Sequence, residues 1–144
     1  MFAALYAAHL VGDHWAQTSR QAAWKGREGW EGRRACAVHI ATLTACKAAA
    51  VTALHLSGQQ VRPVRTALAL AGDAVSHYLA DRRSLDPARG LARLAELAGL
   101  RDFWKLGAPR PGQDDNPVLG TGAYALDQAF HVGCLWAASV AAAR

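Results

Sequence analysis

The stretch "ACAVHIATLTACKAAAVTALHL", residues 35–56, indicates the fold class through its composition. Alanine dominates this stretch, and the whole chain holds 33 alanines among 144 residues. Alanine has the highest helix propensity of all residues, and β-branched residues, which favour strands, are sparse along the chain. The sequence therefore predicts an all-α protein.

Working outward from this stretch, we expect four main helices packed as a bundle in a single domain, residues 1–144, which is long enough to bury a core. They are expected at about Phe2–Trp24, Arg34–Leu56, Pro63–Arg83 and Gly122–Ala143. One extra short helix is predicted with Asp86 as its N-cap, Pro87 as its first residue and Gly99 as its terminator. The segment 101–122, rich in proline and glycine, is predicted as a long loop.

Each main helix carries polar residues inside its apolar sequence. On the first helix, His9, Asp13 and Gln17 follow one another at steps of four, which places them on one helix face. The motif H-x-x-x-D recurs at His77 and Asp81, and it is reversed on the last helix. The remaining members of this set are His39, Asp127, Gln128 and His131.

The apolar remainder of these helices predicts that the polar faces point into the bundle. Buried charges are tolerated only when they are paired or bound to a metal, and bundle cores are a common place for such sites. Histidine and carboxylate ligands suit zinc first, with manganese or iron as alternatives. The predicted ligands are His9, Asp13, His39, His77, Asp81, Asp127 and His131.

This ligand set leads to the hypothesis of a metal-dependent hydrolase that acts on a phosphoester. Two neighbouring ions can clamp the attacking and leaving oxygens of such a substrate. In this interpretation Asp13 or Asp127 bridges the ions, Gln17 and Gln128 orient a ligand or water, and Arg20 holds a substrate phosphate.

Several polar residues stand outside the predicted centre. His14 follows Asp13 directly and points about 100° away from it on the helix. His55 is expected at a helix end or the surface, and Lys47 is expected to extend its amine to solvent. Asp73 is the weakest candidate for the centre.

Two other function classes stay open. A single His–Asp pair is usually a structural hydrogen bond, so the first alternative is a non-enzymatic helical protein whose polar network stabilises the fold. The second is nucleic-acid binding, which base stacking on tryptophan could support. Core packing or a lid is the preferred interpretation of the four tryptophans that flank the first helix and the long loop: Trp15, Trp24, Trp30 and Trp104.

Charge and cysteine content bear on location. The net charge is +5, and basic residues gather in segments 20–34 and 81–93, as solvated loops or as surfaces for phosphate-rich partners or anionic membranes. Cys36, Cys46 and Cys134 form no metal-binding motif and are expected to be reduced, and no signal peptide is evident, so we expect a cytoplasmic protein. The inner membrane is the alternative, because residues 35–56 are long enough to span it. Oligomeric state is not predicted.

Four segments carry a resemblance to a known family: "HLVGDHWAQTSRQAAWK", "AVHIATL", "SHYLADRR" and "YALDQAFHVGCLW". Through them the chain resembles, over roughly residues 5–136, a family of bacterial and phage proteins, domain of unknown function 3307. The resemblance implies a small helical protein that keeps the histidine, aspartate and glutamine pattern described above. Members are often predicted to lie in membranes, and the family implies no reaction.

The segment "HLVGD" is also similar to the all-helical zinc-dependent phospholipase C and nuclease group. Those enzymes hold clustered zinc ions with histidines and aspartates from several helices. The similarity implies ligand roles for His9, Asp13, His77 and Asp81, and cleavage of a phosphodiester.

Overall fold

Helices make up all the regular structure that the computed structural model describes, namely in residues 1–83, 90–108 and 120–143. The all-α prediction is therefore confirmed. The helices are α1 (Phe2–His14), α2 (Ser19–Trp24), α3 (Gly29–Leu56), α4 (Pro63–Arg83), α5 (Leu91–Leu97), α6 (Arg101–Trp104) and α7 (Gly122–Ala143).

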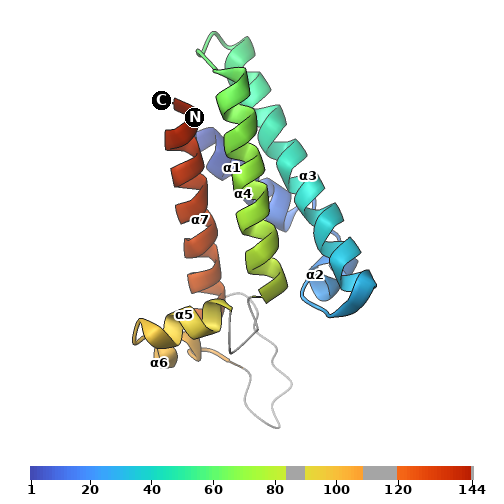
Figure 1. Ribbon diagram of the computed structural model, residues 1–144, viewed down its shortest axis with the longest axis vertical. Coiled ribbons are helices and arrows are strands. Elements are labelled where there is room, and N and C mark those ends of the chain that lie inside the picture. Colours follow the sequence, from blue (N-terminus) through green and yellow to red (C-terminus); the bar gives the residue numbers. More distant parts are fainter. Residues whose placement is uncertain (84–89, 109–119, 144) are drawn as a thin grey trace.

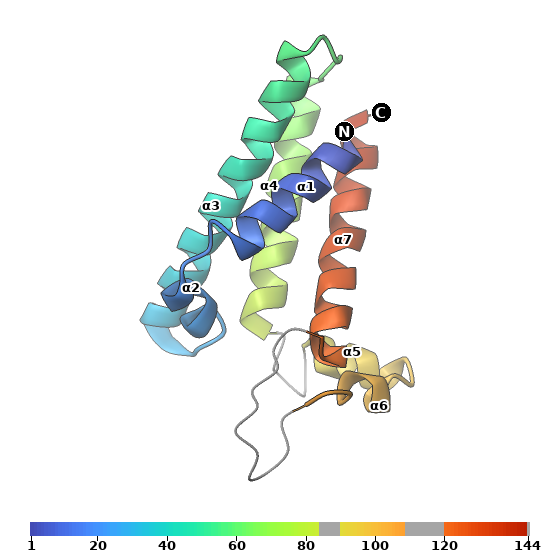
Figure 2. The same ribbon diagram turned by 180° about the vertical axis from the view of Figure 1, so that it is seen from behind.

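Four of these helices form the bundle. Helix α4 packs between α3 and α7, as Figure 1 shows, and α1 runs obliquely across α3 and α7 on the opposite side (Figure 2). Each of the four thus contacts two neighbours, and the ring closes around a common interior. The short helices lie at the end of the bundle away from the termini, with α2 against α3, and with α5 and α6 against the start of α7.

The prediction of one continuous first helix was wrong, because α1 ends at His14 and a separate helix begins at Ser19. Thr18 supplies the physical reason. Its hydroxyl accepts a hydrogen bond from the backbone N–H of Gln21, and the Gln21 side chain accepts one from the backbone N–H of Thr18. This reciprocal capping box starts a new helix where the periodicity alone would continue the old one.

The other boundaries agree in part with the sequence. Helices α4 and α7 have the predicted bounds, whereas α3 begins at Gly29 and not near Arg34. The predicted cap at Asp86 and Pro87 lies outside the described residues, and α5 instead begins after Gly90. Helix α6 occupies the start of the segment predicted as a loop.

The interior of the bundle changes from apolar to polar along the helices. Near the termini, each long helix contributes one side chain to an apolar cluster of Leu5, Val51, Leu70 and Leu135. Burying a side chain of this size contributes about 1.5–3 kcal/mol to stability. The buried histidines and aspartates come next, after this layer in α1 and α4 and before it in α3 and α7.

Several large apolar side chains are exposed on the outer surface of the bundle. Trp15 and Trp30 are mostly exposed, so of the two expectations for these residues, core packing or a lid, core packing was wrong. Among the described residues, α3 is the one helix that is long and apolar enough to cross a membrane. A core helix of a soluble protein meets the same criterion, so this finding leaves the location open.

Close packing of α1 on α3 depends on Gly12. A Cβ atom at this position would overlap the Leu43 side chain and lie 3.2 Å from Leu43 Cα. The absence of a side chain thus lets the two backbones approach next to Asp13.

We predict that Gly12→Ala lowers the free energy of unfolding by about 1–3 kcal/mol, because α1 must move away from α3 to admit the methyl group. Gly72→Ala is the matched control, since a Cβ at this exposed position of α4 meets no atom within 4 Å. It should raise stability by about 0.5–1 kcal/mol through helix propensity. Urea unfolding of both variants checks the prediction, and equal stabilities would contradict it.

Candidate metal centre

The four long helices bring five predicted ligands together in the interior. Asp13 comes from α1, His39 from α3, His77 and Asp81 from α4, and His131 from α7. All five residues are buried, with at most 7% of their surface exposed. Residues from distant parts of the chain therefore lie close together in the interior.

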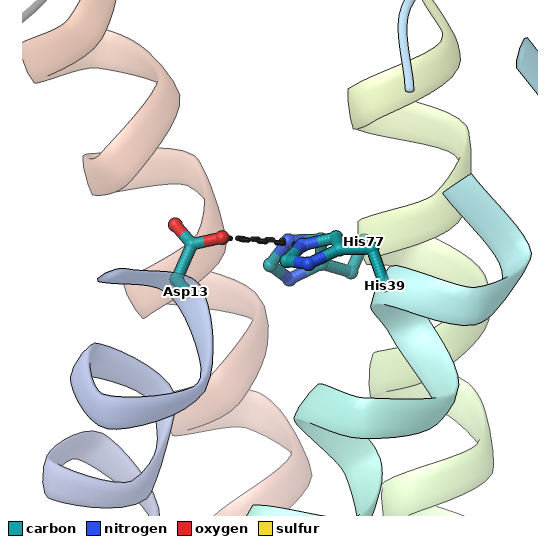
Figure 3. Close-up of side chains that lie close together, drawn as sticks. All are labelled: Asp13, His39 and His77. Carbon is teal, nitrogen blue, oxygen red and sulfur yellow. Dashed lines mark ion pairs between the residues drawn. The ribbon is translucent and has the colours of Figure 1, made fainter. Parts of the chain in front are cut away.

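Asp13 faces two imidazoles across the bundle (Figure 3). Its Oδ1 atom lies 3.2 Å from His39 Nε2 and 4.0 Å from His77 Nε2. Its other oxygen, Oδ2, accepts a hydrogen bond of 3.2 Å from Gln128 Nε2. Gln128 therefore fixes the Asp13 carboxylate with one oxygen turned towards the histidines.

Asp81 lies between His39 and His77, which face one of its oxygens, and Lys25 and His131, which face the other. Its Oδ2 atom is 3.4 Å from His39 Nε2 and 3.6 Å from His77 Nε2. Its Oδ1 atom is 3.1 Å from Lys25 Nζ and 3.9 Å from His131 Nε2. The two oxygens of Asp81 thus face different groups, which is the arrangement a bridging carboxylate requires.

Many polar atoms of the centre have no hydrogen-bond partner among the described residues. They are both ring nitrogens of His9, His39 and His131, Nε2 of His77, Oδ1 of Asp13 and Oδ2 of Asp81. Each buried polar atom left without a partner costs about 1–3 kcal/mol. A bound cation would offset much of this cost, because neutral imidazole nitrogens and carboxylate oxygens are the ligands it needs.

The two central carboxylates differ in acidity. Burial alone would raise the pKa of Asp13, but the His39 imidazole and the Lys25 ammonium outweigh it and hold that pKa well below its usual range. Burial raises the pKa of Asp81 in spite of the nearby Lys25. The pKa of Lys25 is itself raised, because the attraction of Asp81 and Asp13 exceeds the effect of its burial.

The interior also keeps histidines neutral. Burial, with a smaller contribution from the charge of Lys47, lowers the pKa of His9 from 6.5 to about 4. Burial and the neighbouring His131 lower the pKa of His77 as well. The rings of His77 and His131 are stacked with centroids 3.7 Å apart. A neutral imidazole is the form that binds a metal ion.

Two overlapping groups have the spacing of a metal site. The first is Asp13, His39 and His77, and the second is His77, Asp81 and His131; in each group the ligand atoms lie within 4.8 Å of one another. His77 belongs to both groups. Because one imidazole nitrogen binds one ion at a time, a second ion would depend on a bridging carboxylate, which Asp81 is placed to provide.

Two other predicted ligands lie at the margin of this arrangement. His9 is fully buried, and its ring lies 5.5 Å from that of His77 and 5.9 Å from that of His131 between centroids, but it joins neither ligand group. Asp127 contacts His131 Nε2 at 3.5 Å, and 23% of its side chain is exposed. Asp127 thus forms the solvent-accessible edge of the centre.

The residues with predicted supporting roles lie in different places. Gln128 contacts a central carboxylate, as described above. Gln17 follows the end of α1 and donates its hydrogen bond to the backbone carbonyl of Asp13, at 3.0 Å, so it does not share the predicted helix face. Arg20 pairs at the surface with Glu31, at 3.1 Å, and lies over the ring of Trp24.

Sequence reasoning missed Lys25. This residue directly follows α2 as its C-cap, at the start of a segment that was interpreted as a charged loop. Its Nζ lies 3.1 Å from Asp81 and 3.6 Å from Asp13. No periodicity marks it, because it comes from outside the four long helices. Its position directly after an apolar turn, "QAAWK", was the available signal.

Lys47 was also misplaced by the sequence analysis. It does not reach solvent, since its side chain is 1% exposed and its Nζ lies 2.5 Å from Asp73 Oδ2. The pair joins α3 to α4. Asp73 is therefore buried as the partner of Lys47 and does not belong to the centre. Two charges of opposite sign neutralise each other here, as buried charges must.

The residues predicted to stand apart from the centre do so. His14 is exposed and lies 2.7 Å from the hydroxyl of Tyr124, and His55 is exposed in the last turn of α3. All three cysteines are free. Burial raises the pKa of Cys36 to about 12, so its thiol stays protonated beside the carboxylates.

Comparisons of the chain with protein-family models, with curated proteins and with solved structures found no match. Function is therefore inferred from the chemistry of the centre itself.

We predict that acid destabilises the metal-free protein between pH 6.5 and about 4. The pKa of His9 is lower in the folded state, so the unfolded chain binds the proton first and stability falls as pH decreases through this window. His9 alone accounts for roughly 3 kcal/mol between the two limits, from its pKa change of about 2.5 units. Urea unfolding in EDTA at about pH 7 and pH 5 measures the effect.

The variant His9→Gln provides the control for this prediction. It removes one titrating group and should reduce the pH dependence, leaving the part that His77 contributes in the same direction. Equal unfolding free energies of the unmutated protein at the two pH values would show that the buried imidazoles do not titrate as proposed.

Proposed function

We propose that the chain is a metal-dependent hydrolase with a His/Asp centre that holds a divalent transition metal, and that its substrate is a phosphoester. The observation that carries the proposal is the convergence of Asp13, His39, His77, Asp81 and His131 from four helices, in two groups whose ligand atoms lie within 4.8 Å of one another.

The ligand chemistry favours zinc, with manganese or iron as alternatives. A divalent ion bound by these residues would act as a Lewis acid and would lower the pKa of a bound water towards neutrality. The chain's own contribution is to fix the carboxylates: Gln128 holds Asp13, and Lys25 holds Asp81.

A substrate would approach from the side of Lys25 and Asp127. Their side chains are 20% and 23% exposed, whereas the ligands behind them are nearly inaccessible. A phosphate group at this edge would meet the cationic Lys25. Arg20, on the same short helix, would reach such a phosphate only after leaving Glu31.

We predict that protein purified without chelator contains bound transition metal and that EDTA lowers its melting temperature. His39→Gln and His77→Gln should each weaken metal binding by at least about tenfold, because each removes a direct ligand. His14→Gln is the matched control, since this exposed histidine next to Asp13 contacts Tyr124 and not the centre. Elemental analysis and metal titration provide the measurement.

Hydrolysis is tested separately with bis(p-nitrophenyl) phosphate as the probe. Activity should disappear in EDTA, return with zinc or manganese, and survive His14→Gln. If the protein holds no metal and its melting temperature is the same in EDTA, the His/Asp centre is a structural network and the proposal is wrong. If the protein binds metal but does not hydrolyse phosphoesters, the metal centre stands and the proposed reaction is wrong.

The second candidate is a non-enzymatic, membrane-associated helical protein, and the outer face of α4 favours it. Val64, Leu68, Val75 and Leu79 share one face of this helix and are 47–71% exposed. The apolar helix α3 packs beside it. An apolar stripe of this extent on the surface is typical of a contact with a partner or with lipid.

This candidate predicts that the expressed protein sediments with membranes and remains there after a carbonate wash. Replacing Leu68 and Val75 by asparagine should release it, since both changes remove exposed apolar surface without touching the buried centre. Recovery of the unmutated protein in the soluble fraction would rule the candidate out and support the cytoplasmic location.

A further inference from the structure

Lys25 is the cation of the centre that comes from outside the four long helices. Its ammonium lies between the two central carboxylates, 3.1 Å from Asp81 Oδ1 and 3.6 Å from Asp13 Oδ1. Its side chain is four-fifths buried, although lysine usually keeps its charge in water. The contact is thus a part of the centre and not a surface ion pair.

The backbone around Lys25 is held in place for this contact. The Arg82 guanidinium donates to the carbonyl oxygen of Lys25 at 2.9 Å and also to that of Arg27. A Cβ at Gly32 would overlap the Arg27 carbonyl group, so the glycine lets α3 pass close to this turn. These contacts attach the end of α2 to α3 and α4 and direct Lys25 to one position.

The charges of the centre can be counted from its residues. Asp13, Asp81 and Asp127 contribute three negative charges, and Lys25 contributes one positive charge. The imidazoles bind metal in their neutral form. The three carboxylates and the ammonium together therefore carry two net negative charges, which one divalent ion neutralises. Two divalent ions beside Lys25 would leave two excess positive charges in a buried site, which is strongly unfavourable.

We propose that the Lys25 ammonium takes the place of a second metal ion, so that the protein binds one divalent ion per chain. This inference rests on the proposed metal-dependent function and specifies its ion count. Removal of the Lys25 charge leaves three carboxylates, which match two divalent ions together with a hydroxide derived from water. In that variant Asp81, whose two oxygens face different groups, would bridge the two ions.

The other buried lysine does not enter this count. Lys47 Nζ pairs with Asp73 at 2.5 Å, and the two charges cancel. The double variant Lys47→Met/Asp73→Asn therefore removes a buried ammonium without changing the net charge near the ligands. It serves as the matched control for Lys25→Met.

The experiment is a titration of the metal-free protein with cobalt(II), followed by its visible absorption, with zinc content measured independently after dialysis. We expect one ion per chain for the unmutated protein, for Lys25→Arg and for the Lys47→Met/Asp73→Asn control. We expect two ions per chain for Lys25→Met. Circular dichroism checks the fold of each variant, and Lys25→Gln carries the same test if Lys25→Met does not fold.

The outcomes separate this inference from the proposed function. Two ions in the unmutated protein, or one ion in a folded Lys25→Met or Lys25→Gln protein, would overturn the role of Lys25 while the metal centre stands. Two ions in the Lys47→Met/Asp73→Asn control would show that any loss of buried charge admits metal, which also overturns it. No ion in the unmutated protein would overturn the proposed function itself.

Discussion

Asp13 and Asp81 are buried in the same interior, and the elements around them must stabilise two carboxylates there. Two carboxylates removed from water are stable only if cations or hydrogen-bond donors approach them closely. Each of the neighbouring elements supplies such a group: Lys25 from α2, His39 from α3 and Gln128 from α7. The packing of the helices and the chemistry of the centre therefore follow from the same requirement.

The division of the interior into layers allows the bundle to carry this centre. The apolar cluster of Leu5, Val51, Leu70 and Leu135 lies towards the termini and provides hydrophobic stabilisation without polar groups. The Lys47–Asp73 pair joins α3 and α4 within the polar part of the bundle. The apolar cluster and this pair stabilise the fold. The histidines and carboxylates of the centre can therefore be arranged for binding, because the fold does not depend on them alone.

The ligand geometry of the centre and its accessible edge support the proposed metal site. Several ring nitrogens and carboxylate oxygens make no hydrogen bond among the described residues and approach one another at ion-pair distances, such as 3.2 Å between His39 Nε2 and Asp13 Oδ1. Asp127 and Lys25 open the same group to solvent at one edge. Burial of the ligands together with one accessible edge suits an ion that must meet a small substrate.

Some expectations from the sequence failed where local and tertiary interactions compete. The four-residue spacing placed Gln17 on a helix face with His9 and Asp13, but the Thr18–Gln21 capping box ends that helix first. Lys47 was expected to reach water, but Asp73 on the facing helix neutralises it in the interior. Core packing was one of two expectations for Trp15 and Trp30, and both side chains are exposed.

Composition and four-residue spacing were enough to predict the all-α class, the bounds of α4 and α7, and seven candidate ligands, five of which lie together in the centre. This was possible because helix propensity and four-residue spacing are local properties of the chain. The relative placement of the helices, in contrast, sets the two oxygens of Asp81 against different groups, leaves His9 and Asp127 at the margin of the centre, and brings Lys25 to both carboxylates from the end of α2. These placements depend on the distances between helices, and the spacing of residues along one helix gives no information about such distances.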